Sequence, residues 1–232
     1  MKSLNNWLLV LLVLSCFGCS SPVHEDGRGC AFVSDSIQYR VEFMSAGCVR
    51  ILSFPQGDTL ITKRLVVDAE KPAFKDYKWE DTGQKLVFRT RELSIAFDKA
   101  DAAFTFQEIS TGKLLLKEKG DGKARNFKRS VAGGEQCLEV TQCFVPTEDE
   151  AIYGLGQYQN GIMNYRGKSV LLLQANMDIV NPFLISTNGY GVLWDNYSST
   201  KFEDTKEGYS FTSEVGDASD YYFVYGKNMD EV

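Results

Sequence analysis

Histidine is nearly absent from this sequence of 232 residues. The single one, His24, falls in a polar segment over residues 20–29, which its small and polar composition predicts to be a tether. We therefore expect no imidazole in the folded part of the chain. That expectation excludes a Ser-His-Asp triad, a Cys-His nucleophile pair and a histidine-based zinc site.

Positive charge is also scarce. The chain has 25 Lys and Arg residues against 31 Asp and Glu residues, which gives a formal net charge of −6. Removing a leader over residues 1–19 would remove Lys2 and no acid, which leaves 24 bases against 31 acids, or −7. Nucleic-acid binding requires a basic stripe, so we expect no nucleic-acid partner.

Motifs that bind cofactors or metals are missing as well. Gly154, Gly156 and Gly161 in the stretch YGLGQYQNG (153–161) do not form GxGxxG, and no GKS or GKT follows a GxxxxG. The cysteines beyond the leader lack the close CxxC spacing of a four-cysteine zinc site. We expect neither a cofactor nor a metal, and we interpret the glycines as a bend where backbones approach closely.

No apolar run is long enough to span a bilayer, which needs about 20 residues. Lys2 precedes the short apolar run WLLVLLVL (7–14), which is typical of a secretory signal peptide, here predicted over residues 1–19. Cys16 or Cys19 would carry the lipid of a bacterial lipoprotein, exported to the periplasm or the cell surface and attached to the membrane only by that anchor. The alternative is plain secretion with cleavage near Ser20.

Four cysteines remain beyond the leader, namely Cys30, Cys48, Cys137 and Cys143. Six strand residues at about 3.4 Å each separate Cys137 from Cys143 by about 20 Å, too far for a disulfide. Cys30 could pair with Cys48 in an exported protein, or both could be buried free thiols.

A helical stripe is absent, whereas alternating apolar and polar residues recur along the chain. In IQYRVEFM (37–44), the apolar residues occupy every second position, which predicts a half-buried strand. Asn188-Gly189 marks a hairpin turn. The ranges predicted to be strands are 37–44, 85–91, 93–98, 103–108, 113–118, 137–144, 169–174, 182–187, 190–196, 209–214 and 220–226.

Many short strands with frequent turns indicate an all-β fold, an antiparallel β-sandwich. Residues 30–232 are enough for one such domain and too few for a (β/α)₈ barrel of about 250 residues.

Aromatic rings beside amides or carboxylates are typical of sugar contacts, because apolar sugar faces stack on rings and hydroxyls bond to polar groups. Core aromatics beside polar strand ends would give the same pattern. The residues that fit are Tyr158, Gln159, Asn160, Tyr165, Gln174, Asn176, Trp194, Asp195 and Asn196. Glycoside hydrolysis needs two carboxylates across a sugar, and spacing singles out no pair. The available carboxylates are Asp178, Asp195, Glu203, Asp204, Glu214, Asp217 and Asp220.

Three blocks carry a resemblance to a known family: IYGLGQYQNGIMNYRGK (152–168), LLLQANMDIVNPFLISTNGYGVLWDN (171–196) and DYYFVYGKNMDEV (220–232). Together they resemble the N-terminal β-sandwich of glycoside hydrolase family 31, especially α-xylosidase-like members. The resemblance is dense over 150–232, and over 30–149 only the strand-rich character agrees. It implies a galactose-mutarotase-like supersandwich in front of a (β/α)₈ barrel that carries both catalytic aspartates.

The resemblance also implies that this chain is non-catalytic, because it stops where the family would enter the barrel. We expect no catalytic residues, an oligosaccharide ligand of the α-xyloside or α-glucoside type, and a barrel partner in cis or in trans. One sandwich loop of the family touches the sugar, and the matching stretch is 172–183, where Gln174 and Asn176 are the candidate contacts. The chain lacks the Arg-Asp pair that some members carry there, so these amides could instead only cap strands.

Two alternatives remain open. The chain could be a stand-alone carbohydrate-binding or structural surface lipoprotein, which predicts a closed polar surface. It could also be a hydrolase that uses two of its own carboxylates. The sandwich also resembles mutarotases, which act through a histidine and an acid, and the missing histidine argues against mutarotase activity of its own.

Overall fold

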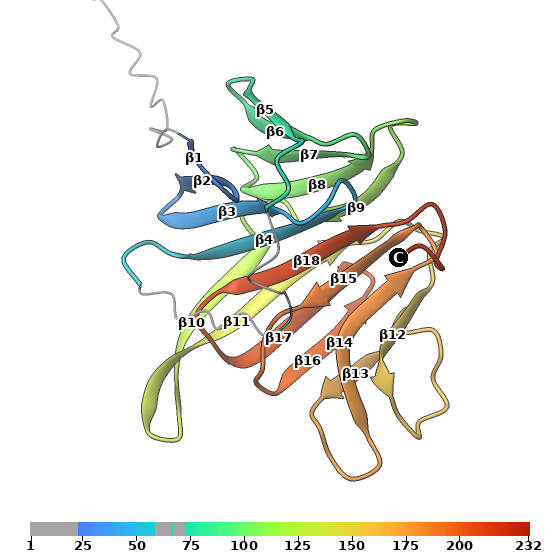
Figure 1. The fold of residues 1–232 in the computed structure, drawn as a ribbon. Helices are drawn as coiled ribbons and strands as arrows, with labels where there is room; N and C mark the ends of the chain where they lie inside the picture. Colours follow the sequence, from blue (N-terminus) through green and yellow to red (C-terminus); the bar gives the residue numbers. More distant parts are fainter. Residues whose placement is uncertain (1–22, 59–65, 67–72) are drawn as a thin grey trace, which may run out of the picture.

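The computed structural model describes residues 23–58, 66 and 73–232. Every regular element in these ranges is a β-strand, and the strands form two antiparallel sheets that face each other (Figure 1). The predicted all-β antiparallel sandwich is thus confirmed. The same ranges contain no helix that could cross a membrane.

The first sheet has eight strands. In spatial order they are β1 (His24–Asp26), β2 (Gly29–Ser34), β3 (Ile37–Phe43), β4 (Cys48–Pro55), β18 (Ser219–Tyr225), β15 (Tyr190–Trp194), β14 (Ile179–Ser186) and β12 (Ile152–Gln157).

The second sheet has ten strands. Nine follow one another as β13 (Ser169–Leu172), β16 (Thr200–Thr205), β17 (Gly208–Gly216), β11 (Glu135–Val145), β9 (Leu114–Glu118), β8 (Ala103–Glu108), β7 (Leu93–Asp98), β6 (Lys85–Arg89) and β5 (Lys78–Asp81). The tenth, β10 (Arg125–Ala132), pairs with β11 in a long hairpin.

Strands with clean alternation were the predictable ones. The ranges predicted for β7 and β8 match the structure residue for residue. β4 escaped prediction because most of its residues are buried on both faces, which removes the alternation. β10 escaped for the opposite reason, since both of its faces are largely exposed.

The sheet begins earlier than predicted. His24–Asp26 pair with β2 inside the segment predicted to be a tether, so the tether prediction over 20–29 is wrong from His24 onward. The fold therefore contains one imidazole, which is exposed on an edge strand. The predicted signal peptide with Cys16 and Cys19 lies outside the described residues and stays a prediction, which mass spectrometry of the mature N-terminus would test.

All four described cysteines are free thiols. The prediction that Cys137 and Cys143 do not pair is confirmed. The sequence left either a disulfide or two free thiols open for Cys30 and Cys48, and in the structure both are free thiols. Burial raises the pKa of Cys30 to about 12 and that of Cys48 to about 11. Both therefore stay protonated near neutral pH, where the neutral thiol is a poor nucleophile.

The larger of two hydrophobic clusters fills the space between the sheets. Aromatic rings meet across the interface: Phe106 stacks on Phe223 at 4.2 Å between centroids, and Trp194 stacks on Phe211 at 5.6 Å. Such pairs contribute about 0.5–1.5 kcal/mol each beyond their buried area. Aromatic side chains therefore supply much of the packing that joins the two sheets.

A buried carboxylate, Glu118, links the sheets by polar contacts. Its Oε1 accepts hydrogen bonds from Gln142 Nε2 and Tyr221 OH, each at 2.9 Å. Its Oε2 accepts one from the backbone N–H of Phe104 at 2.7 Å and also pairs with Arg125. The side chains of both residues are buried, so water compensates little of the charge of the Arg125 guanidinium. Glu118 supplies that compensation through the ion pair.

We expect Glu118→Gln to lower the free energy of unfolding by about 3–5 kcal/mol, because it leaves Arg125 buried without its counter-charge. Equilibrium denaturation in urea measures this. The matched control is Glu207→Gln, which breaks an exposed ion pair with Lys119 and should leave stability nearly unchanged. Equal transition midpoints for the two variants would contradict the assignment.

Candidate functional site

From β11 onward the chain passes repeatedly between the two sheets. β11, β13, β16 and β17 belong to the second sheet, whereas β12, β14, β15 and β18 belong to the first (Figure 1). Backbone groups in a connection that leaves one sheet lose their ladder partners and need others. Side chains of these connections supply many of those partners.

Gln174 lies where β13 and β14 diverge toward different sheets. Its Nε2 donates to the backbone oxygen of Asp178 at 2.7 Å, and its Oε1 accepts from the backbone N–H of Val180 at 3.1 Å. The planar amide thus bonds to β14 as a neighbouring strand would. We call β13, β14 and the turn between them the β13–β14 hairpin, although the two strands pair in different sheets. Gln174 holds this hairpin in shape, which is the strand-capping role that the sequence left open beside sugar contact.

Asn176 lies at the tip of the same hairpin. The backbone N–H of Asp178 donates to the oxygen of Ala175 at 3.3 Å, which makes Asn176 and Met177 the two central residues of a turn. Asn176 is exposed, and within the described ranges its side chain makes no hydrogen bond. Both predicted contact residues lie in one hairpin, and of the two only Asn176 has an amide with no hydrogen bond to the described residues.

The glycine-rich stretch is a bend in β12 beside this hairpin. Gly154, Leu155 and Gly156 all have positive φ, and the pairing of β12 with β14 shifts register between the two glycines. A Cβ on Gly156 would lie 2.1 Å from the oxygen of Ile179, and one on Gly154 would lie 2.5 Å from the oxygen of Phe183. The predicted close approach of backbones is confirmed.

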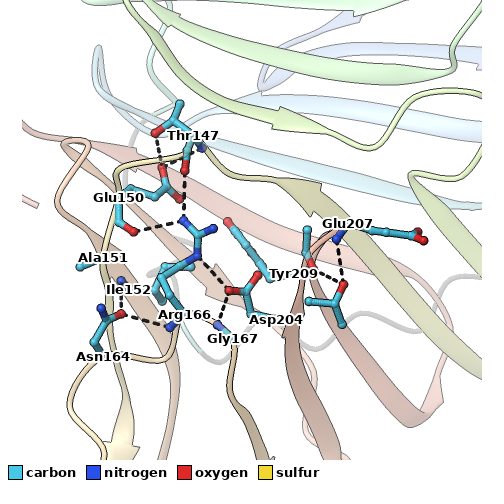
Figure 2. Close-up of polar contacts among 12 residues, drawn as sticks. Thr147, Glu150, Ala151, Ile152, Asn164, Arg166, Gly167, Asp204, Glu207 and Tyr209 are labelled. Carbon is cyan, nitrogen blue, oxygen red and sulfur yellow. Dashed lines mark hydrogen bonds and ion pairs between the residues drawn. The ribbon is translucent and has the colours of Figure 1, made fainter.

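Arg166 fastens the connection that follows β12 (Figure 2). Its Nε donates to Asp204 Oδ2 at 2.8 Å, and its Nη1 donates to the backbone oxygens of Thr147 and Glu150 at 3.0 and 3.1 Å. The N–H of Gly167 donates to the same Asp204 oxygen at 2.6 Å. The clamp ties two connections between sheets to β16, the partner strand of β13, and so positions the start of the hairpin.

Glu150 completes this clamp. Its carboxylate accepts from Thr147 Oγ1 at 3.0 Å and from the Tyr190 hydroxyl at 2.7 Å (Figure 2 shows the Thr147 contact). Burial raises the pKa of Glu150, while these hydrogen bonds and Arg166 oppose that rise. The group acts as a structural acceptor in the wall of the sandwich.

Most of the other residues considered for sugar contact have structural tasks. Tyr158 OH donates to the oxygen of Leu155 at 3.0 Å, and Trp194 Nε1 donates to Ser213 Oγ at 2.8 Å inside the core. Asn196 Nδ2 donates to the oxygen of Val215 at 3.0 Å. These three residues fit the alternative hypothesis from the sequence, that the pattern comes from core aromatics beside polar strand ends.

Three of the carboxylates considered for hydrolysis are held in ion pairs. Asp204 is buried against Arg166, and Asp220 is buried against Arg50, whose Nε donates to its Oδ1 at 2.7 Å. Glu203 pairs with Lys201 on the surface at 2.8 Å. In residues 23–58, 66 and 73–232, no group of three or more His, Cys, Asp or Glu side chains could hold a metal ion.

The β13–β14 hairpin exposes large apolar side chains. Leu171, Leu173, Met177 and Ile179 are 51%, 48%, 68% and 56% exposed, and we call these four residues the hairpin patch. Met163, in the connection before β13, is 78% exposed. Such a concentration in one hairpin differs from scattered surface apolar residues and is typical of a contact surface.

A family model for the glycosyl hydrolase 31 N-terminal galactose mutarotase-like domain matches residues 38–203. This chain belongs to glycosyl hydrolase family 31. An α-xylosidase of Saccharolobus solfataricus is 31% identical over 212 residues, covering 85% of this chain and 27% of that enzyme. The resemblance stated from the sequence is thus confirmed, including the galactose-mutarotase-like fold.

Solved family 31 structures agree with the fold. The α-xylosidase of Xanthomonas citri is 30% identical, with a TM-score of 0.71 over 79% of this chain and 20% of its own. A soil-metagenome α-xylosidase, solved with xylose, has a TM-score of 0.75 at 22% identity over 89% of this chain and 32% of its own. The chain therefore spans about a third or less of these family 31 enzymes and corresponds to their N-terminal domain.

The Arg166 clamp was not predicted from the sequence. The signal in the sequence was NYRG (164–167), an arginine that precedes a glycine and lies two residues after an asparagine. Its partner Asp204 lies 38 residues further along the chain, and spacing alone cannot join them.

We expect Gly156→Ala to destabilise the fold by about 3 kcal/mol, because a Cβ there combines strained backbone with overlap on Ile179. Gly161→Ala is the matched control. Gly161 also has positive φ, but a Cβ there meets nothing within 4 Å, so we expect a loss of about 1 kcal/mol. Chemical denaturation measures both, and equal losses would show that the close approach to β14 is unimportant.

Proposed function

We propose that this domain is the non-catalytic N-terminal part of a family 31 α-glycosidase. In this proposal, the β13–β14 hairpin contacts a sugar and docks the domain on a catalytic barrel, in cis or in trans. One observation carries this proposal. The stretch that the resemblance identifies as the sugar contact also exposes the four large apolar side chains of the hairpin patch.

Docking is supported by the chemistry of the hairpin patch. Four large apolar residues remain substantially exposed, although the core of the sandwich is closely packed. Exposed apolar clusters commonly mark interfaces between protein parts. The alternative of a stand-alone lipoprotein predicted a closed polar surface, which this hairpin does not offer.

Sugar contact is supported by Asn176 and by the relatives. The Asn176 amide is exposed and held by a turn that Gln174 fixes. A preorganised amide of this kind suits the hydroxyl groups of a sugar. Relatives of the same fold include α-xylosidases and a Flavobacterium johnsoniae dextranase solved with isomaltotriose, which favours an α-linked oligosaccharide.

Calorimetric titration of the chain with an α-xylosyl disaccharide and with isomaltotriose tests the sugar contact. We expect binding, and we expect Asn176→Ala to weaken it about fivefold, the effect of one lost hydrogen bond. The matched control is Gln84→Ala, which removes an exposed amide between β5 and β6, at the opposite edge of the second sheet from β13. Equal affinity of the wild-type chain and the Asn176→Ala variant would remove Asn176 from the site.

Docking is tested by the double variant Leu171→Ser/Leu173→Ser, mixed with the catalytic barrel of a family 31 α-xylosidase that lacks its own first domain. Buried interface leucines contribute about 1 kcal/mol or more each, so we expect affinity to fall tenfold or more. Val131→Ser, which changes a valine that is 60% exposed on the β10–β11 hairpin, is the control. The docking surface is misplaced if both variants bind as well as the wild type.

A further inference from the structure

An asparagine is followed by a glycine at two places in the chain, Asn160-Gly161 and Asn188-Gly189. An asparagine side chain loses ammonia most readily in this pair, because glycine has no Cβ to crowd the approach of its backbone nitrogen to the asparagine Cγ. The two pairs have the same chemistry and differ in their surroundings. The structure therefore decides which of them can react.

The Asn188-Gly189 turn holds both of its reacting groups in hydrogen bonds. Asn188 Nδ2 donates to the backbone oxygens of Leu114 at 3.1 Å and Leu115 at 2.7 Å, both in β9. The N–H of Gly189 donates to the oxygen of Ser186 at 3.1 Å. The Asn188 carboxamide cannot turn toward the Gly189 nitrogen unless these hydrogen bonds break first.

The Asn160-Gly161 pair is exposed in the connection between β12 and β13. Among the described residues, neither Asn160 Nδ2 nor the N–H of Gly161 has a hydrogen-bond partner, and a Cβ on Gly161 would meet nothing within 4 Å. Asn160 Oδ1 accepts from the N–H of Ile162 at 2.9 Å, which folds the carboxamide back against the backbone that follows it. The same donor stabilises the negative charge that develops on this oxygen when the Cγ is attacked.

We propose that Asn160 is a site of spontaneous deamidation in the folded protein, whereas Asn188 is protected. The Gly161 nitrogen loses its proton to hydroxide and bonds to Asn160 Cγ, and the Cγ–Nδ2 bond breaks to release ammonia, which takes its proton from water. Water then opens the cyclic succinimide at either carbonyl and leaves an aspartate or an isoaspartate. The added negative charge lies between Tyr158 and Ile162, which pack against the core.

The reaction requires neither a sugar nor a barrel, so this inference does not depend on the proposed function. Incubation of the folded chain at mildly alkaline pH, then digestion at acidic pH and mass spectrometry of the peptides, measures both sites in one sample. We expect Asn160 to lose ammonia at least about tenfold faster than Asn188, because the hydrogen bonds of the Asn188 turn have to open first. In concentrated urea, which removes the structure, we expect the two sites to react at similar rates.

Two variants test the mechanism, and Asn188 is the internal control in both. Gly161→Ala places a Cβ beside the attacking nitrogen, and Asn160→Gln requires a larger ring to close, so each should slow the loss of ammonia at residue 160 about tenfold. An unchanged rate in Gly161→Ala would overturn the inference. So would equal rates at Asn160 and Asn188 in the folded chain, or a difference that persists in urea, because the structure would then not be its cause.

Discussion

The sharing of one aromatic core by two sheets is the constraint on which this structure depends. Rings such as Phe106 and Phe223 stack across the interface, and strands on both sides must stay in register to keep them together. From β11 to β18 the chain meets this constraint by passing back and forth between the sheets. Each passage breaks a backbone ladder, and buried polar groups without partners are costly.

Polar side chains supply hydrogen-bond partners to the backbone in these connections between the sheets. Few polar side chains are therefore left to contact a ligand. Arg166 bonds to backbone oxygens between β11 and β12, and Gln174 bonds to the backbone between β13 and β14. Asn196, which lies between β15 and β16, bonds to the backbone oxygen of Val215 in β17. Residues that look like a sugar-binding set in the sequence are thus largely the fastenings of the sandwich.

The same logic leaves one hairpin with a different character. Its frame is fixed by Gln174, by the bend at Gly156 and by the Arg166 clamp, yet its tip exposes Asn176 and Met177. A well-held backbone with exposed side chains suits a contact surface, because little conformational freedom is lost on binding. The described part of this chain therefore presents a framed, partly apolar hairpin.

The sequence by itself determined the all-β class, most strands with clean alternation, the unpaired Cys137 and Cys143, and the family, because these depend on local period and on ordered blocks. It also located the hairpin. It could not assign the strands to two sheets, the extra strand at His24, or the buried pairs of Arg166 with Asp204 and Arg125 with Glu118. Only the tertiary structure decided that Gln174 is a fastening and Asn176 is not. An amide has the same chemistry in both tasks, and the backbone groups that it meets depend on where two distant strands part.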